Sequence, residues 1–274
     1  MTPRTDEFRD FRRSTLHARH RRTPDRRPGR RGGRRGRRRR SDDLHRRGAV
    51  SVLHIDHTTA QTAFLEELDA FVAAVGSASD HDLLAPSRCH GWAVVDVVVH
   101  VRTGLQDMLG GTVSPSASAP DTDAASYWRT DVPSNDSGSD AVDRILWTRR
   151  TASAYRRPTG AVGHLRAAAD AVRTAVELMP DGPVAFQGRV LTSGDFLATW
   201  VVELAVHHLD VLEDVDLGPP TTESLRLGRL TAEAIAGAAF PSGWSDADCL
   251  LAGAGRLDPG DVGDALAAAL PVLG

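Results

Sequence analysis

The chain of 274 residues contains no lysine, so all 33 of its basic residues are arginine. Its two cysteines, Cys89 and Cys249, provide neither a disulfide framework nor the paired cysteines of a zinc ribbon. No uninterrupted apolar run approaches the roughly 20 residues that a membrane-spanning helix needs. The sequence also lacks a G-x-S-x-G nucleophile turn, a Walker loop and a Gly-rich dinucleotide turn. These absences predict a cytoplasmic protein with reduced thiols and argue against several common enzyme classes.

Positive charge is concentrated at the N-terminus. Residues 1–48 contain 19 arginines and 6 acidic residues, whereas the rest of the chain contains 14 arginines and 30 acidic residues. This segment has few apolar residues, so we expect residues 1–50 to be disordered. Three interpretations remain open: upstream sequence included by a misplaced start, with Val50 or Val52 as the true beginning, a tail without function, or a basic arm that binds phosphates. Any nucleic-acid contact is expected to be confined to residues 1–48.

From residue 51 onward, apolar residues recur with helical spacing. Phe64, Leu68, Phe71 and Val75, for example, lie four and three residues apart. Similar patterns occupy four stretches, at residues 64–76, 94–109, 162–179 and 196–214, and the S/T-x-x-D sequence from Thr192 to Asp195 indicates a helix start before the last of them. They predict an all-α four-helix bundle over residues 51–218.

The remaining segments differ in character. Residues 112–139 are rich in Ser, Asp, Pro and Ala, and we expect a flexible loop there. Residues 140–155 regain helical spacing and either lengthen the third helix or form a separate turn. Residues 183–190 suggest a short strand or hairpin. After Pro219-Pro220, residues 219–274 predict a small α-rich appendage, with helical patterns at 222–239, 246–252 and 260–273.

Two polar residues interrupt the last helix of the bundle. Glu203 and His207 are four residues apart and therefore share one helix face. A carboxylate surrounded by apolar residues costs several kcal/mol unless something pairs with it. His100 lies in a similarly apolar setting, in GWAVVDVVVHV. Spacing alone leaves an intrahelical pair or a solvated face open, but one Glu and two His form the donor set of a catalytic zinc site with an open coordination position.

Neighbouring residues have less specific interpretations. Asp210, three residues after His207, either orients its imidazole or is a surface carboxylate near the helix end. His208 faces roughly 100° away from His207 and is expected to be a core or surface histidine. His90 is expected to lie in a loop. Cys89 and His90 make a poor nucleophile–base pair, because adjacent side chains rarely align for proton transfer.

Two motifs carry a family resemblance. CHGWAVVDVVVHV (residues 89–101) is similar to C-x-G-W-[ST]-V-x-D-hydrophobic-H, and VVELAVHHLDV (residues 201–211) to E-x-x-x-H-x-x-D. Both resemble the N-terminal family of mycothiol-dependent maleylpyruvate isomerase, within the DinB-like bundles. GWSDADCLLAGAGR (residues 243–256) resembles a segment that follows the bundle in many relatives. Ala93 stands where relatives place Ser or Thr, which leaves Asp96 as half of a capping box.

The resemblance covers about residues 52–216 and implies a DinB-like bundle with His100, Glu203 and His207 as ligands of a divalent metal, expected to be Zn²⁺. It implies that a low-molecular-weight thiol, mycothiol, is transferred or added to a small electrophile. Because the isomerase proper carries a larger second domain, maleylpyruvate itself does not carry over as the substrate. Arg102 either holds an acidic substrate or faces solvent. The alternative is a non-enzymatic metal-binding or scaffold protein.

Overall fold

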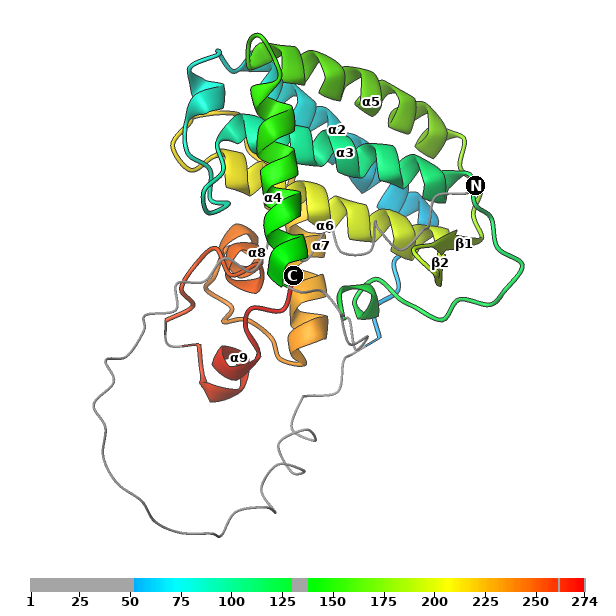
Figure 1. Ribbon diagram of the computed structural model, residues 1–274. Coiled ribbons are helices and arrows are strands. Elements are labelled where there is room, and N and C mark those ends of the chain that lie inside the picture. Colours follow the sequence, from blue (N-terminus) through cyan, green and yellow to red (C-terminus); the bar gives the residue numbers. More distant parts are fainter. Residues whose placement is uncertain (1–51, 130–137, 261, 274) are drawn as a thin grey trace, which may run out of the picture.

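The computed structural model describes residues 52–129, 138–260 and 262–273, so the interpretations of residues 1–50 fall outside the described part of the chain. Within that part, eight α-helices and one two-stranded sheet are present. Four helices lie side by side and form the bundle (Figure 1). They are α2 (His57–Ser77), α3 (Val94–Thr112), α5 (Thr159–Glu177) and α6 (Ser193–Val211). The all-α four-helix bundle expected from the sequence is confirmed.

Helix α6 is the most enclosed element of the bundle. It packs mainly against α2 and also contacts α3 and α7, while α3 packs mainly against α5. Every one of its 19 residues is buried, whereas α2, α3 and α5 each keep exposed positions. Any polar side chain on α6 therefore enters the protein interior.

A β-hairpin leads directly into α6. Strands β1 (Pro183–Phe186) and β2 (Arg189–Thr192) are antiparallel, with Phe186 opposite Arg189. The two turn residues, Gln187 and Gly188, have φ angles of 49° and 72°, as the tight turns of two-residue hairpins require. The hairpin expected near residues 183–190 is confirmed.

The first turn of α6 is fixed on two sides. The Thr192 side chain caps the helix by accepting a hydrogen bond from the Asp195 backbone N–H at 3.0 Å. The Asp195 carboxylate in turn accepts a hydrogen bond from the backbone N–H of Ile55 at 2.9 Å. A Cβ at Gly194 would lie 2.0 Å from the Ile55 carbonyl oxygen, so glycine permits the chain before α2 to cross α6 closely.

Residues 113–129, part of the flexible loop expected at residues 112–139, form a mostly irregular segment that contacts the hairpin. The backbone N–H of Asp121 donates to the carbonyl of Val190 in β2 at 2.9 Å. The buried side chains of this segment are Ala124, Ala125, Tyr127 and Trp128. The polar composition of this segment does not reveal its hydrogen bonds to the hairpin or the burial of its two aromatic side chains. Residues 130–137 lie outside the described residues.

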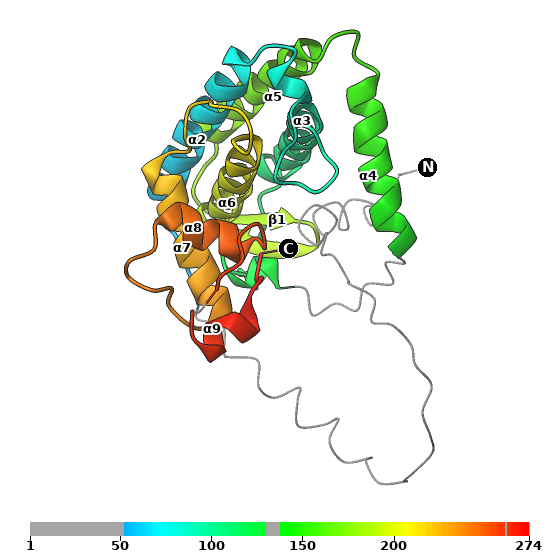
Figure 2. The same cartoon turned by 90° about the vertical axis from the view of Figure 1, so that its left-hand side faces the viewer.

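Residues 140–155, for which two interpretations were open, belong to a separate helix, α4 (Gly138–Ser153). It packs against α3 and stands beside the bundle rather than inside it (Figure 2). Its outward side chains include Val142, Leu146 and Trp147.

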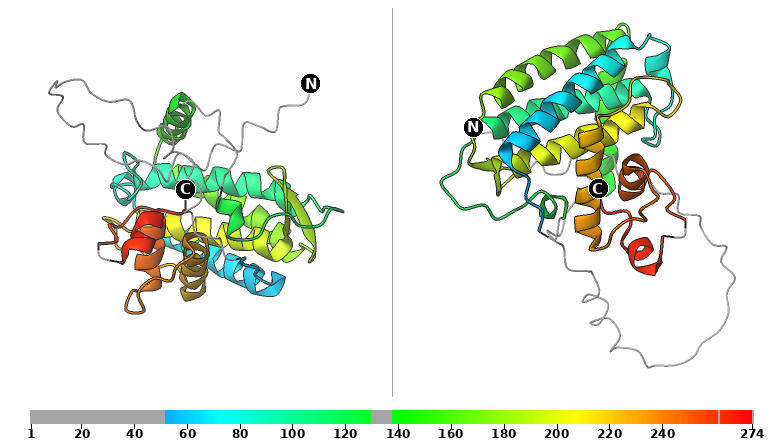
Figure 3. Two further views of the ribbon diagram at one scale, coloured as in Figure 1. Left: turned by 90° about the horizontal axis from the view of Figure 1, so that it is seen from below. Right: turned by 180° about the vertical axis from the view of Figure 1, so that it is seen from behind.

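The C-terminal appendage consists of α7 (Thr222–Ala236), α8 (Asp246–Gly253) and α9 (Asp264–Ala269), close to the three helical patterns in the sequence. Helix α7 packs against α6 and α8 (Figure 3). A Cβ at Gly228 would lie 2.7 Å from the Leu250 side chain, so α7 and α8 approach closely there. The buried apolar residues of the appendage and the bundle form one core. Across the described ranges, no helix combines the length and apolar character needed to cross a membrane.

Candidate metal centre

His100 lies in the middle of a valine-rich helix. Helix α3 starts after a turn at Gly91, whose φ of 76° favours glycine, and the Asp96 side chain accepts a hydrogen bond from the Ala93 backbone N–H at 2.9 Å. Valine has a low intrinsic helix propensity, so tertiary packing has to stabilise this helix. All residues from 94 to 101 are buried. The same burial carries His100 into the core, where it is 2 % exposed.

Helix α6 carries four ionisable side chains along its second half. They are Glu203, His207, His208 and Asp210, and all four are buried. Each would cost several kcal/mol in an apolar interior without a polar partner. The contacts of these four residues therefore define what the centre of the molecule can do.

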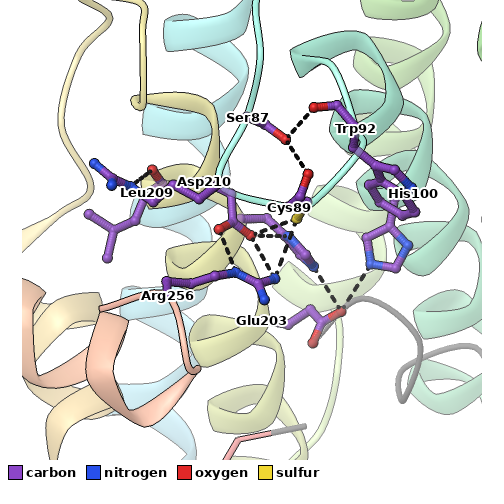
Figure 4. Close-up of polar contacts among 10 residues, drawn as sticks. Ser87, Cys89, Trp92, His100, Glu203, Leu209, Asp210 and Arg256 are labelled. Carbon is purple, nitrogen blue, oxygen red and sulfur yellow. Dashed lines mark hydrogen bonds and ion pairs between the residues drawn. The ribbon is translucent and has the colours of Figure 1, made fainter. Parts of the chain in front are cut away.

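Three of the predicted residues meet between α3 and α6. The Glu203 Oε1 atom lies 3.4 Å from His100 Nε2 and 3.6 Å from His207 Nε2. The two imidazole rings are edge to face, with centroids 4.6 Å apart. Figure 4 shows the Glu203 carboxylate at the point where the dashed contacts from both sides converge. The structure thus brings together residues from two helices that are about 100 positions apart in the sequence.

The donor set fits a divalent transition metal. Two imidazole nitrogens and one carboxylate oxygen can all lie within 4.8 Å of one another. Zinc–ligand bonds of about 2.0–2.2 Å in tetrahedral geometry place neighbouring donors about 3.4 Å apart. The separations of 3.4 and 3.6 Å match that value, whereas good N–H···O hydrogen bonds are shorter. The spacing therefore suits three ligands around an ion better than a hydrogen-bonded cluster.

Asp210 lies in the interior beside His207 and is not a surface carboxylate. It is fully buried, and its Oδ2 atom lies 3.0 Å from His207 Nδ1. A proton on Nδ1 directed at this carboxylate leaves the lone pair on Nε2, which faces Glu203. Burial opposes protonation of His207, but Asp210, followed by Cys89 and Glu203, raises its pKa well above the usual value, so a metal ion at Nε2 would have to displace a proton.

Two further side chains reach Asp210, and the sequence pattern had assigned a role to neither. Arg256, in the turn after α8, places Nε 2.9 Å from Oδ1, and the Cys89 thiol donates to Oδ2 at 3.1 Å. Burial opposes ionisation of Asp210, but Arg256 and His207 outweigh it and lower its pKa below the usual range. Burial and the Asp210 charge raise the pKa of Cys89, so it remains a thiol. The signal for Arg256 was its place at the end of the segment at residues 243–256.

A second set of possible metal donors shares His207 with the first. Cys89, His207 and Asp210 also present donor atoms within 4.8 Å of one another. The Arg256 guanidinium already contacts both Asp210 oxygens and lies 3.4 Å from the Cys89 sulfur. A cation at this position would be repelled by the guanidinium, so the trio of His100, Glu203 and His207 is the better candidate.

The other predicted residues lie outside the trio. Arg102 donates a hydrogen bond to the hydroxyl of Tyr155 at 3.1 Å, at the connection between α4 and α5. His90 lines a cavity of about 520 Å³ together with Trp92 and Arg256. Trp92 also contacts the His100 ring, and Arg256 contacts Asp210. Trp92 thus contacts both this cavity and His100, whereas Arg256 is linked to His207 only through Asp210.

His208 is a core histidine and faces a different network. Its Nδ1 atom lies 2.7 Å from Glu67 Oε1 in α2, and its Nε2 atom lies 2.8 Å from the Gly218 carbonyl. Glu67 is fully buried, whereas its neighbour Glu66 is exposed. The stripe of Phe64, Leu68 and Phe71 puts Glu67 on the buried face of α2, but helical spacing does not reveal its partner 141 residues later, so the network was not predicted.

Comparison with known proteins places the chain in one family. The family model described as the mycothiol maleylpyruvate isomerase N-terminal domain matches residues 64–212. Neither the curated proteins nor the solved structures give a match. The matched region covers more than half of the chain and includes both motifs that contain the trio. The chain therefore belongs to the mycothiol maleylpyruvate isomerase N-terminal domain family.

Proposed function

We propose that this protein is a metal-dependent thiol transferase or isomerase, with Zn²⁺ held by His100, Glu203 and His207. Its substrates would be a low-molecular-weight thiol such as mycothiol and a small electrophile. The observation that carries the proposal is the 3.4 and 3.6 Å spacing of the buried donor atoms, which suits coordination better than hydrogen bonding. Family membership supports mycothiol as the thiol.

The residues around the trio orient its side chains and leave one side open for a substrate to approach. When bound, a divalent ion with two neutral imidazoles and one carboxylate keeps a net positive charge, which lowers the pKa of a coordinating thiol. Asp210 holds His207 through Nδ1, and the Trp92 ring packs 5.4 Å from that of His100. Glu203 is 8 % exposed, against 2 % for His100 and 1 % for His207, so a substrate would approach from the side of Glu203.

Neither cysteine of the chain would compete with the substrate thiol. Cys89 is buried, and its thiol donates a hydrogen bond to Asp210 at 3.1 Å. Burial raises the pKa of Cys89, and burial also raises the pKa of Cys249 to about 11. Both therefore remain protonated at neutral pH, which makes them poor nucleophiles.

The alternative function is a metal-binding scaffold in which the site joins α3 and α6 without turnover. A structural metal site is coordinatively closed, and its removal unfolds the domain, whereas a catalytic site keeps an open position. The cluster found among the described residues contains three protein donors. This number favours the enzyme, because a fourth position remains for the thiol.

Metal analysis of the purified protein tests the proposal. We expect the wild type to bind about one equivalent of zinc, and His100→Ala, Glu203→Ala and His207→Ala each to lose it. His164→Ala, at an exposed histidine of α5, is the matched control and should retain the metal. Full occupancy in the three site variants would refute the ligand assignment.

A second measurement separates the enzyme from the scaffold. The metal-free wild type should stay folded by circular dichroism, and the zinc-loaded protein should consume mycothiol in the presence of a chromogenic electrophile. Unfolding on metal removal, combined with no thiol consumption by the loaded protein, would favour the scaffold.

A further inference from the structure

The C-terminal appendage sends one charged side chain into the bundle. Arg256 is 46 residues beyond Asp210 in the sequence, yet its Nε atom lies 2.9 Å from Oδ1 and its Nη2 atom 3.3 Å from Oδ2. The Arg256 side chain is 5 % exposed and that of Asp210 is fully buried. Such a two-point contact fixes the plane of the carboxylate as well as its charge.

The backbone around Arg256 is held in place by the end of α8. Gly255 has a φ of 70°, and the Arg256 N–H donates to the carbonyl of Leu251 at 2.7 Å. Glycine in this conformation followed by a backward hydrogen bond is the usual termination of a helix. The direction of the Arg256 side chain is thus set by α8, which packs mainly against α7 and also against α6.

On its other side, Asp210 faces a proposed metal ligand. Its Oδ2 atom lies 3.0 Å from Nδ1 of His207, and the Nε2 atom of the same ring faces Glu203. Arg256, Asp210 and His207 therefore form a continuous chain of contacts from the appendage to the trio. Figure 4 shows the first of these contacts, with the Arg256 guanidinium against the Asp210 carboxylate.

We infer that Arg256 is a positioning residue for the metal ligand His207 and acts through Asp210, so that the appendage completes the centre built in the bundle. The inference rests on the proposed metal site. It concerns a residue beyond the matched region at 64–212. Among the contacts described, Arg256 is the only residue of the appendage that contacts the Asp210 carboxylate. Without it, Asp210 would no longer hold the His207 ring at a fixed angle. Groups that orient metal-ligating histidines in this way typically change metal affinity by about 10–100-fold.

Zinc affinity, measured by competition with a chromophoric chelator, tests the inference. Arg256→Met should weaken zinc binding by about 10–100-fold, and Arg256→Lys, which keeps the charge but not the two-point contact, should give a smaller loss. The matched control is Arg229→Met. Arg229 also forms ion pairs, but these are only partly buried and join it to Glu233 and Asp246 inside the appendage. It should lower the melting temperature without changing zinc affinity.

A double-mutant cycle tests the route through Asp210. In an Asp210→Asn background, Arg256→Met should change zinc affinity by no more than about twofold, because the charged pair of acceptor oxygens through which Arg256 acts is gone. The visible spectrum of the cobalt-substituted protein should also change in Arg256→Met and not in Arg229→Met.

Several outcomes would overturn the inference. The first is a zinc affinity in Arg256→Met equal to that of the wild type. The second is a loss of zinc affinity on Arg256→Met in the Asp210→Asn background as large as in the wild-type background. The third is a loss of zinc affinity in Arg229→Met as large as that in Arg256→Met. If Arg256→Met does not fold, wild-type affinity in folded Arg256→Lys would overturn it. Failure of the wild type to bind zinc, or zinc retained by His100→Ala, would instead refute the proposed function.

Discussion

The buried carboxylate of Glu67 is predicted to be a major contributor to stability. It accepts hydrogen bonds from the Thr221 N–H at 2.8 Å and the Ser224 hydroxyl at 2.6 Å, and contacts His208 Nδ1 at 2.7 Å. These partners belong to α6, to α7 and to the cap of α7. Glu67→Leu would leave them without an acceptor, at about 1–3 kcal/mol for each unsatisfied buried group. We expect a total loss of about 3–5 kcal/mol, as when one partner of a buried ionic contact is removed.

Glu67→Gln should be much less damaging. The Gly218 carbonyl can only accept a hydrogen bond, so His208 Nε2 carries a proton and Nδ1 can act as an acceptor. A glutamine amide at position 67 can therefore donate to Nδ1, while its carbonyl oxygen accepts from both Thr221 and Ser224, which contact the same oxygen of Glu67. All groups keep a partner, and the expected loss is about 1 kcal/mol because a charge-assisted bond becomes a neutral one.

Urea unfolding of the metal-free protein, followed by circular dichroism, measures both free energies without a contribution from ligand binding. Glu66→Leu, at the exposed neighbour, is the control and should remain within about 0.5 kcal/mol of the wild type. In thermal unfolding, Glu67→Leu should lower the melting temperature by roughly 10 °C. The reasoning fails if Glu67→Leu costs less than about 1 kcal/mol, or if Glu67→Gln is as damaging as Glu67→Leu.

Three further predictions concern other parts of the chain. Gly194→Ala should lower the free energy of unfolding, measured in urea, by more than about 3 kcal/mol, because the added Cβ would lie 2.0 Å from a backbone oxygen. Gly163→Ala, which has open space around it, should leave this free energy unchanged or raise it. Both cysteines should react with Ellman's reagent only after unfolding, since both are buried with raised pKa values; rapid reaction of the folded protein would contradict this. Burial opposes ionisation of Asp123, but hydrogen bonds led by that from the Ser126 backbone lower its pKa, so its stabilisation is present above about pH 4 and lost as the pH falls. Protection of residues 113–129 against hydrogen exchange, relative to the intrinsic exchange rate, should fall at low pH, and this fall should be absent in Asp123→Asn.

The sequence predicted those parts of the molecule that depend on local patterns. The start of α6 follows from its Thr192 cap, and the proximity of Glu203 and His207 follows from their four-residue spacing. His100 could be joined to them because its motif and theirs occur together in one family. Each of these inferences uses residues within about one or two helical turns, or a pair of short motifs.

The parts that escaped prediction depend on contacts between distant segments. Glu67 and His208 are 141 residues apart, and Arg256 and Asp210 are 46 apart. Their partners are selected by the packing of α2 and the appendage on α6, which leaves no periodic mark in the sequence. The contacts of residues 113–129 were not predicted for a related reason, because their hydrogen bonds are made with a hairpin that lies much later in the chain.

The adjacent histidines of α6 show why residue type alone does not identify a ligand. His207 and His208 are both buried, and each has a carboxylate beside its Nδ1 atom, from Asp210 and Glu67 respectively. The difference lies at Nε2, which faces a carbonyl oxygen at 2.8 Å in His208 but the Glu203 carboxylate at 3.6 Å in His207. A carbonyl at hydrogen-bond distance consumes the Nε2 proton and leaves no lone pair for a metal. The wider gap at His207 leaves Nε2 available for an ion, so the same pair of residues provides one histidine that fastens helices and one that can bind a metal.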